Sequence, residues 1–466
     1  MTRKAKFIIS DTHLGAGRYE AGNALEDFIS DADFAQWVSE LIAESERDGV
    51  EMELIINGDF LEMLQVPAVP DFDPTAEYPP DVYAPSDEAA CVQKVRHVIE
   101  GHPDVFTAMA DFIHESSPRR YITINKGNHD PDVYWPGVQD AIRQAIGATG
   151  DRTNLLDFPS VAVQREGLYI EHGNQYAERI NRYQNFAEPL DPEHPDQLER
   201  VPGSRFVYEF FNSLERQRPW IDGISPLTAL VWYGFQFDPG FALIALAALL
   251  RAAPGLIAGE LGFRAATPAQ ERAAALLNEI ASSERQAEIA RRLAEDPAFR
   301  ATFYRRVEAA LDEAGLEERP PSRAAPGVEP DAFQVAQDIQ RRYTESLIAE
   351  AERKAAATGA LVVVFGHTHR PVVRQLSNGG VYINSGTWVW RGDFAGANRE
   401  LWRDLFENPA KYSGYREPTY VRVDYDEDER PRAGLHILSL PGTIPQPPAQ
   451  ERIGCLEALK RLFTRR

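Results

Sequence analysis

Seven side chains that bind divalent cations well occur in this sequence, most of them beside a glycine and directly after a short apolar run. They are Asp11, His13, Asp59, Asn128, His172, His367 and His369. Carboxylate, amide and imidazole donors without a thiolate suit manganese, iron, zinc or cobalt better than a soft metal. Seven donors exceed the four of a tetrahedral zinc site. They suit a pair of metals that share one carboxylate, an arrangement that can hold the attacking and leaving oxygens of a phosphoryl displacement.

The spacing of these donors also favours metal binding. Asp11 and His13 are two residues apart, as are His367 and His369, and in extended backbone such residues point to the same side. Glycine stands directly before Asp59, Asn128 and His367 in the sequence. Glycine lets the backbone bend closely around a bound ion.

Short strands must deliver these donors. Residues 7–10, 54–57 and 121–125 are predicted strands that are each followed within three residues by a donor, and predicted helices separate them. One of these helices carries a buried face over residues 34–42, and Asp33 is expected to cap it. Alternating strands and helices predict an α/β fold, in which ligands bind at the carboxyl ends of the strands.

The second half of the predicted core is rich in strands. Residues 161–164 and 168–171 form a hairpin, residues 361–365 form a buried strand, and Asn378-Gly379 is a hairpin turn. Residues 420–425 and 435–440 are late antiparallel strands. The pattern predicts a core of two mixed sheets.

Four segments are expected. Residues 1–175 hold the first half of the core, 176–330 a helical cap insertion with an apolar tract, and 331–440 the second half of the core. Residues 441–466 are a proline-rich linker and a basic amphipathic tail. The apolar run 241–250 is too short for a membrane span, which needs about 20 residues. It is interpreted either as a buried cap helix or as an interfacial hairpin that faces lipid.

Five segments together resemble the signature blocks of the calcineurin-like metallophosphoesterases, in that family's order. They read Ser10-Asp11-Thr12-His13-Leu14-Gly15, Gly58-Asp59, Gly127-Asn128-His129-Asp130, His172-Gly173 and Gly366-His367-Thr368-His369. The resemblance spans most of the core but neither the insertion nor the tail. It implies a four-layer α/β/β/α sandwich of two mixed sheets with a large, mainly helical insertion.

The resemblance also implies a role for each residue. Asp11, His13 and His369 would hold one metal, Asn128, His172 and His367 would hold a second, and Asp59 would bridge them. Manganese is the metal expected first, with iron, zinc or cobalt as alternatives. A hydroxide held between the metals would attack phosphorus. His129 would protonate the leaving oxygen, and Asp130 would complete the catalytic pair by orienting backbone or imidazole.

The substrate stays open at this point. The insertion lies where UDP-diacylglucosamine pyrophosphatases carry their cap, but it is longer, and those proteins have Arg where this chain has His129. A phosphomonoester, a phosphodiester or a pyrophosphate bond would suit the site, in a lipid-linked or nucleotide-linked substrate. The alternatives are a soluble cyclic-nucleotide phosphodiesterase, a nuclease, and a scaffold without activity.

Composition narrows the partners. The net charge of −22 disfavours nucleic acid, because backbone binding depends on Lys and Arg. Two cysteines without a CxxC motif disfavour a disulfide framework, and the amino terminus lacks the apolar stretch of a signal peptide. A cytoplasmic enzyme is therefore expected. The oligomeric state is left open.

The tail has its own pattern. Apolar residues recur near helical spacing in residues 453–463, among basic residues that contrast with the acidic chain. Such a tail can bind the anionic surface of the inner membrane, so peripheral attachment is one interpretation. A loose tail, or a helix docked on the body, is the other.

Overall fold

The structure is a computed structural model of the 466-residue chain. It describes residues 3–114, 117–177, 179–216, 218, 221, 227–252, 268–313, 316, 331–389, 397–411 and 416–438. The proline-rich linker and the basic tail predicted at 441–466 lie outside the described residues, as do residues 253–263 and 318–330 of the predicted insertion.

The first sheet has six strands in the order β11-β10-β1-β2-β3-β4. Their bounds are β1 Lys4–Ile9, β2 Glu51–Asn57, β3 Arg120–Asn125, β4 Leu156–Asp157, β10 Thr419–Tyr425 and β11 Pro431–Ile437. Strands β1 to β4 are parallel, whereas β10 and β11 join as an antiparallel pair at the β1 edge. The sheet is therefore mixed, and its parallel strands all end at one edge.

The second sheet has five strands in the order β5-β6-β7-β9-β8. Their bounds are β5 Val163–Arg165, β6 Leu168–Ile170, β7 Val362–Phe365, β8 Val372–Gln375 and β9 Val381–Asn384. Strands β6, β7 and β9 are parallel, and β5 and β8 form the predicted antiparallel hairpins with β6 and β9. Strands β6 and β7, adjacent in this sheet, are separated in the sequence by the whole insertion.

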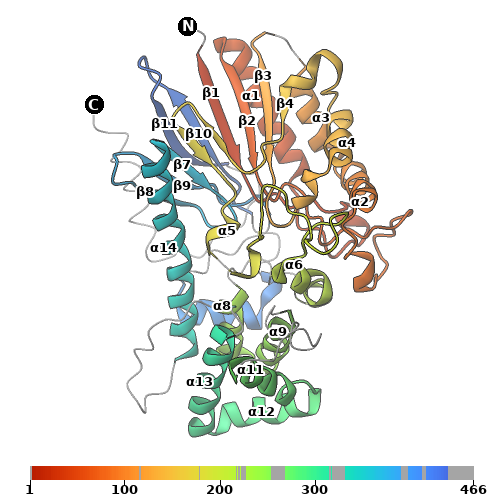
Figure 1. Cartoon of the computed structure of the whole chain (residues 1–466), viewed down its shortest axis with the longest axis vertical. Helices are drawn as coiled ribbons and strands as arrows, with labels where there is room; N and C mark the ends of the chain where they lie inside the picture. The colour runs from red at the N-terminus through yellow and green to blue at the C-terminus, as the bar shows by residue number, and fades with distance from the viewer. Residues whose placement is uncertain are drawn as a thin grey trace.

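The two sheets pack face to face, and helices cover their outer faces (Figure 1). Ile8 of β1 packs between the sheets with Ile170 and Val364, whereas its neighbours Phe7 and Ile9 pack on the helical side. This alternation is the two-residue period of a strand. The prediction of a mixed α/β fold with two mixed sheets and a helical insertion is confirmed.

Helices α1 to α4 cover the first sheet, and α14 covers the second. Their bounds are α1 Asp31–Asp48, α2 Glu88–Gly101, α3 Pro103–Phe112, α4 Pro136–Ala145 and α14 Ala332–Thr358. The prediction that Asp33 caps the first helix is wrong, because the helix begins at Asp31 after Ser30. Asp33 instead lies in the first turn, where a carboxylate faces the positive end of the helix dipole.

The insertion forms a helical unit below the sheets (Figure 1). Its helices are α6 Pro202–Phe206, α7 Asn212–Glu215, α8 Leu227–Phe237, α9 Pro239–Ala252, α11 Pro268–Glu279, α12 Ser283–Glu295 and α13 Pro297–Glu313, with a π-helical turn at Val207–Phe211. The short helix α5 Asn174–Ala177 instead packs against the second sheet and α14. Helix α14 runs from this unit up along the second sheet and links the two bodies.

The helical unit takes in segments that the sequence assigned to the second half of the core. Ala332 and Ala336 of α14 pack in its apolar interior, together with Trp402 of α15 (Arg399–Glu407). The Trp402 ring stacks on Tyr233 of α8, with ring centroids 3.5 Å apart and planes 15° apart. Both rings are fully buried, so α15 closes the helical unit from outside the predicted cap range.

The apolar tract folds into this interior. In α9 the side chains of the 241–250 run are buried, except Ile244, which is 40% exposed. Of the two interpretations of the run, burial supports the cap helix for these residues. Among the described residues, every helix is too short or too polar to cross a membrane.

Candidate metal centre

The predicted ligands lie on strand-end loops with an unusual backbone. Five of them have positive φ angles: Asp11 at 53°, His13 at 46°, Asp59 at 48°, His367 at 68° and His369 at 55°. Residues with a side chain rarely adopt this left-handed conformation, which costs on the order of 1–3 kcal/mol at each position. The rest of the fold must hold these loops in place, as is typical of functional sites.

Two glycines make the close approach of the loops feasible. A Cβ on Gly58 would lie 2.5 Å from Nδ1 of His172, and one on Gly127 would overlap the Asp59 carboxylate. Gly58 also has φ of 84°. Any larger residue at these two positions would push His172 or Asp59 out of the site.

Asp11, His13 and His369 converge as the first predicted ligand set. The Nε2 atoms of His13 and His369 lie 3.0 Å apart, and Oδ1 of Asp11 lies 3.4 Å from Nε2 of His369. One ligand atom from each residue falls within 4.8 Å of the others. Two ring nitrogens and a carboxylate oxygen therefore face one point, as metal binding requires.

Asp59, His172 and His367 form a second group of the same kind. Oδ2 of Asp59 lies 3.0 Å from Nε2 of His172, and Oδ1 of Asn128 lies 3.2 Å from the same nitrogen. The rings of His172 and His367 meet edge to face, with centroids 5.2 Å apart. All seven predicted ligands are thus brought to one site by strands from both sheets.

Asp59 lies between the two groups. Its Oδ2 is 3.8 Å from Nε2 of His13 as well as 3.0 Å from His172. Burial raises the pKa of Asp59, but the charges of His172 and His129 and the hydrogen bond from His172 hold it well below its usual range. An ionised carboxylate between two donor groups is the arrangement that a bridging ligand requires.

Outer hydrogen bonds select the ring nitrogen that each histidine presents. Nδ1 of His13 lies 2.6 Å from Oε2 of Glu62, and Nδ1 of His172 lies 3.0 Å from the Asn57 carbonyl. A ring that donates Nδ1–H to such a partner presents Nε2 as a lone pair. Metal-binding histidines commonly have this outer partner, and it fixes the ring orientation.

His367 offers a direct test of fit for a cation. Its Nε2 is buried and has no hydrogen-bond partner among the described residues, and an unpaired buried polar atom is costly. Burial, together with the charge of His172, lowers the pKa of His367 to about 3, so the ring is neutral. A neutral imidazole with an unpaired nitrogen beside Asp59 fits a metal ligand.

His129 lies at the more open side of the site. Its side chain is 19% exposed, and its ring meets that of His13 edge to face with centroids 4.7 Å apart. The His129 amide donates to Oδ1 of Asp59 at 2.8 Å. A ligand atom of His129 also groups with those of His13 and Asp59, so the geometry allows it to reach a metal as well as a substrate.

Asp130 has a different position from the one that a catalytic group needs. It is fully buried and accepts hydrogen bonds from backbone amides, those of Gly127 at 2.5 Å and Phe60 at 2.7 Å being the shortest. Burial and the charge of Asp59 raise its pKa to about 7. Asp130 therefore orients the backbone of two ligand loops, which is one of the two roles expected for it, and is a positioning residue.

Glu62 is the functional residue that sequence reasoning missed. One oxygen, Oε2, lies 2.6 Å from Nδ1 of both His13 and His129. Burial raises the pKa of Glu62, but the charges and hydrogen bonds of His129 and His13 lower it to about 2. The available signal was a carboxylate three residues after Asp59, on the same loop.

The loop after β9 supports the first ligand set. Oγ1 of Thr387 donates to the Asp11 carbonyl at 2.7 Å, and Oγ of Ser385 lies 2.7 Å from Oγ of Ser10. The His367 amide in turn donates to both oxygens of Asp11 at 3.0 Å. Loops from the two sheets are thereby fixed to each other around Asp11.

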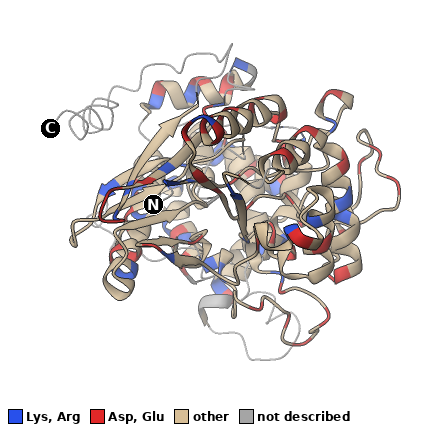
Figure 2. Ribbon diagram, turned by 90° about the horizontal axis from the view of Figure 1, so that it is seen from above, with Lys and Arg blue, Asp and Glu red and all other residues tan. Residues whose placement is uncertain are grey.

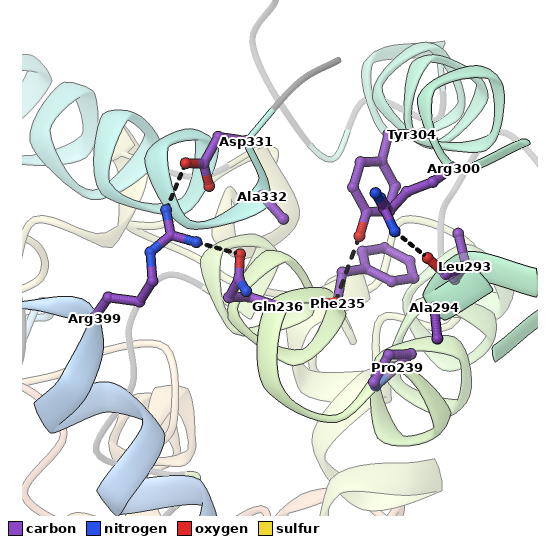
Figure 3. A pocket seen from close by; sticks show the side chains of 10 residues that line it. All are labelled: Phe235, Gln236, Pro239, Leu293, Ala294, Arg300, Tyr304, Asp331, Ala332 and Arg399. Atoms are coloured by element: carbon purple, nitrogen blue, oxygen red, sulfur yellow. Dashed lines mark hydrogen bonds and ion pairs between the residues drawn. The ribbon is translucent and has the colours of Figure 1, made fainter. Parts of the chain in front are cut away.

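A separate cavity of about 540 Å³ lies in the helical unit, and none of its lining residues is a predicted ligand (Figure 3). Its two arginines already have protein partners. Arg399 donates to Gln236 at 2.7 Å and pairs with Asp331 at 2.5 Å, while Arg300 donates to the Leu293 carbonyl at 2.6 Å. The cavity is therefore separate from the metal centre.

Comparison with protein-family models gives no match for this sequence, and comparison with curated proteins gives none either. The case for function consequently depends on the residues and their geometry.

Proposed function

We propose that this protein is a metal-dependent phosphoesterase that hydrolyses a phosphomonoester, phosphodiester or pyrophosphate bond. One observation carries the proposal: two groups of metal-binding side chains lie side by side, and the carboxylate of Asp59 lies between them. A pair of cations with a shared carboxylate is the typical centre for phosphoryl displacement. The order of the five sequence motifs supports the same reaction class.

Two divalent cations fit the donors. Asp11, His13 and His369 would hold one, and Asn128, His172 and His367 would hold the other, with Asp59 between them. Oxygen and nitrogen donors suit manganese, iron, zinc or cobalt, with manganese expected first. When bound, such a pair supplies Lewis-acid stabilisation of phosphate charge and an acidified water.

The protein's own residues would manage the proton of the leaving group. With Nδ1 of His129 on Glu62, Nε2 is the nitrogen that would protonate the leaving oxygen. The ionised Glu62 carboxylate stabilises the protonated ring and fixes its orientation. The partial exposure of the His129 side chain supports its access to substrate. A positioned general acid contributes about 10²–10⁴-fold to rate.

A nuclease is the weaker alternative. Lys and Arg lie scattered among Asp and Glu over the described helices and strands (Figure 2), and the net charge is −22. Binding of a nucleic-acid backbone depends on clustered positive charge. We therefore favour a lipid-linked or nucleotide-linked substrate, or a soluble cyclic nucleotide, over a polynucleotide. A scaffold without activity would not need seven converging ligands.

Two variants test the proposal. Asp59→Ala should lose its bound metal, as measured by elemental analysis. It should also lose activity on aryl phosphates. His129→Ala should keep the wild-type metal content yet slow hydrolysis of an alkyl ester by roughly a hundredfold or more. The loss should shrink with 4-nitrophenyl esters, because that leaving group needs little protonation. Metal-loaded wild-type protein without activity on mono-, di- or pyrophosphate esters would overturn the proposal.

A further inference from the structure

The loop that carries Glu62 is buried and holds its carboxylate at both oxygens. Glu62 is 3% exposed, and Met63 and Leu64, which follow it, are 0% exposed. Oε2 of Glu62 contacts the rings of His13 and His129, while Oε1 accepts a hydrogen bond from the Leu64 amide at 3.2 Å. The position of Leu64 therefore helps to fix the carboxylate that orients both imidazoles.

Two buried side chains hold the backbone of this loop. Nζ of Lys94 on α2 donates to the Met63 carbonyl at 3.1 Å, and Nδ2 of Asn212 on α7 donates to the Leu64 carbonyl at 3.1 Å. Both donors belong to buried residues. Removal of one partner of a buried hydrogen bond leaves the other partner desolvated, so both bonds favour a single conformation of the loop.

The support from Asn212 comes from the insertion and not from the two-sheet body. Asn212 directly follows the π-helical turn at Val207–Phe211, and Glu215 at the end of α7 accepts a hydrogen bond from the side chain of Gln65. Leu64 itself packs in the apolar interior of the helical unit. π-helical turns are rare and frequently occur at functional sites. Here the turn directly precedes the two residues that bind the ligand loop.

Hydrogen bonds thus link the insertion to the metal centre. Asn212 holds the carbonyl of Leu64, and the amide of Leu64 holds Glu62. Glu62 in turn contacts Nδ1 of His13 and of His129. We propose that Asn212 is a positioning residue for Glu62 and, through it, for the first metal site and the acid. The inference rests on the proposed function and deepens it, because the insertion becomes a structural part of the catalytic centre.

Two variants of Asn212 test the inference in the full-length protein. Asn212→Leu fills the space but lacks the amide donor, whereas Asn212→Ala lacks both. At saturating manganese, both should slow hydrolysis of a methyl ester by about tenfold and that of the matching 4-nitrophenyl ester by less than about threefold, because only the methyl ester needs a well-placed acid. A defect in Asn212→Ala that Asn212→Leu restores would show that Asn212 only fills space, and would overturn the inference.

Combined substitutions test the route through Glu62. Residues that act through one another have non-additive effects. Asn212→Leu should weaken manganese binding, measured by calorimetric titration, by about fivefold in the wild-type protein and change it by less than about twofold in Glu62→Gln. The slowing of methyl-ester hydrolysis should be non-additive in the same way. Equal effects in the two backgrounds, or wild-type values in Asn212→Leu, would overturn the inference.

Tyr233→Phe is the matched control. It removes a buried hydrogen bond of the helical unit, the one from the Tyr233 hydroxyl to Gln340 at 2.7 Å, which is not part of the link to Glu62. It should change neither the manganese affinity nor the ratio of the two ester rates. Manganese affinity does not depend on turnover, so the two proposals can fail separately. A non-additive loss of affinity in a protein that hydrolyses no ester would leave the link from Asn212 to Glu62 standing and remove the proposed function.

Discussion

Glu62 controls two imidazoles with one carboxylate oxygen. Because Oε2 lies 2.6 Å from Nδ1 of both His13 and His129, it directs Nε2 of the one toward Asp11 and His369 and fixes the ring of the other. Burial of Glu62 at 3% exposure keeps water from replacing either bond. The negative charge of Glu62, more than its size, stabilises the positions of both histidine rings.

We expect Glu62→Gln to lower kcat/KM and manganese affinity by about 10- to 100-fold, the usual effect of losing an outer partner of a metal ligand. Glutamine keeps the size but loses the charge, and its oxygen can no longer hold both rings equally well. Steady-state kinetics and metal titration measure the change. Glu40→Gln, on the exposed face of α1, is the matched control. Wild-type values in Glu62→Gln would show that the carboxylate is only a packing group.

His102 joins three elements at the level of helices and loops. It ends α2 and begins α3, its Nδ1 lies 2.8 Å from Oδ1 of Asp31 at the start of α1, and its Nε2 lies 3.4 Å from Oε1 of Glu26. The contact with Glu26 is an ion-pair distance without hydrogen-bond geometry. Glu26 also accepts from the Gly17 amide at 2.5 Å, on the segment that follows the first ligand loop.

The contacts of His102 with Glu26 and Asp31 make the free energy of unfolding depend on pH. Burial lowers the pKa of His102, but Glu26 and Asp31 more than offset it and raise the pKa to about 10. In the unfolded chain the value is about 6.5, so folding favours the protonated ring. The contribution to stability is complete below about pH 6.5 and is lost as the pH rises through about 10.

Urea unfolding at pH 6, 8 and 10 measures this effect. Wild type should lose more free energy of unfolding over that range than His102→Gln, which cannot titrate there. His194→Gln, at an exposed histidine, should follow wild type. Parallel curves for wild type and His102→Gln would contradict the raised pKa.

The whole molecule consists of a two-sheet body and a helical unit joined by α14 (Figure 1). The helical unit buries the 241–250 run, apart from Ile244, so these side chains offer little apolar area to a lipid surface. Any attachment to an anionic membrane would then depend on the basic residues of the 441–466 segment, and screening by salt acts on charges of this kind.

We therefore expect the full chain to co-sediment with anionic vesicles at low salt and to be released completely by high salt. A chain ending at Gln450 should stay in solution under both conditions. Each Lys or Arg near the surface would contribute about 1 kcal/mol. Binding of the shortened chain, or binding of the full chain that resists salt, would show that the described body itself contacts lipid.

The sequence alone determined the strand ends and the metal-binding donors. Apolar runs that end at Asp11, Asp59 and Asn128 predict parallel strands with their polar residues at one edge, and the structure has this arrangement. These signals are local, because a strand period and a neighbouring glycine can be recognised within a few residues. The hairpins of the second sheet follow from equally local turn signals.

Only the tertiary structure decided which residues support that site. Glu62 meets His129, 67 positions away in the sequence, and Trp402 of α15 stacks on Tyr233 of the helical unit. Burial of the 241–250 run depends on the same packing. Such contacts join segments that are distant in sequence, and neither composition nor periodicity encodes which distant partner a side chain meets. These contacts form only when the two-sheet body and the helical unit both pack against α14.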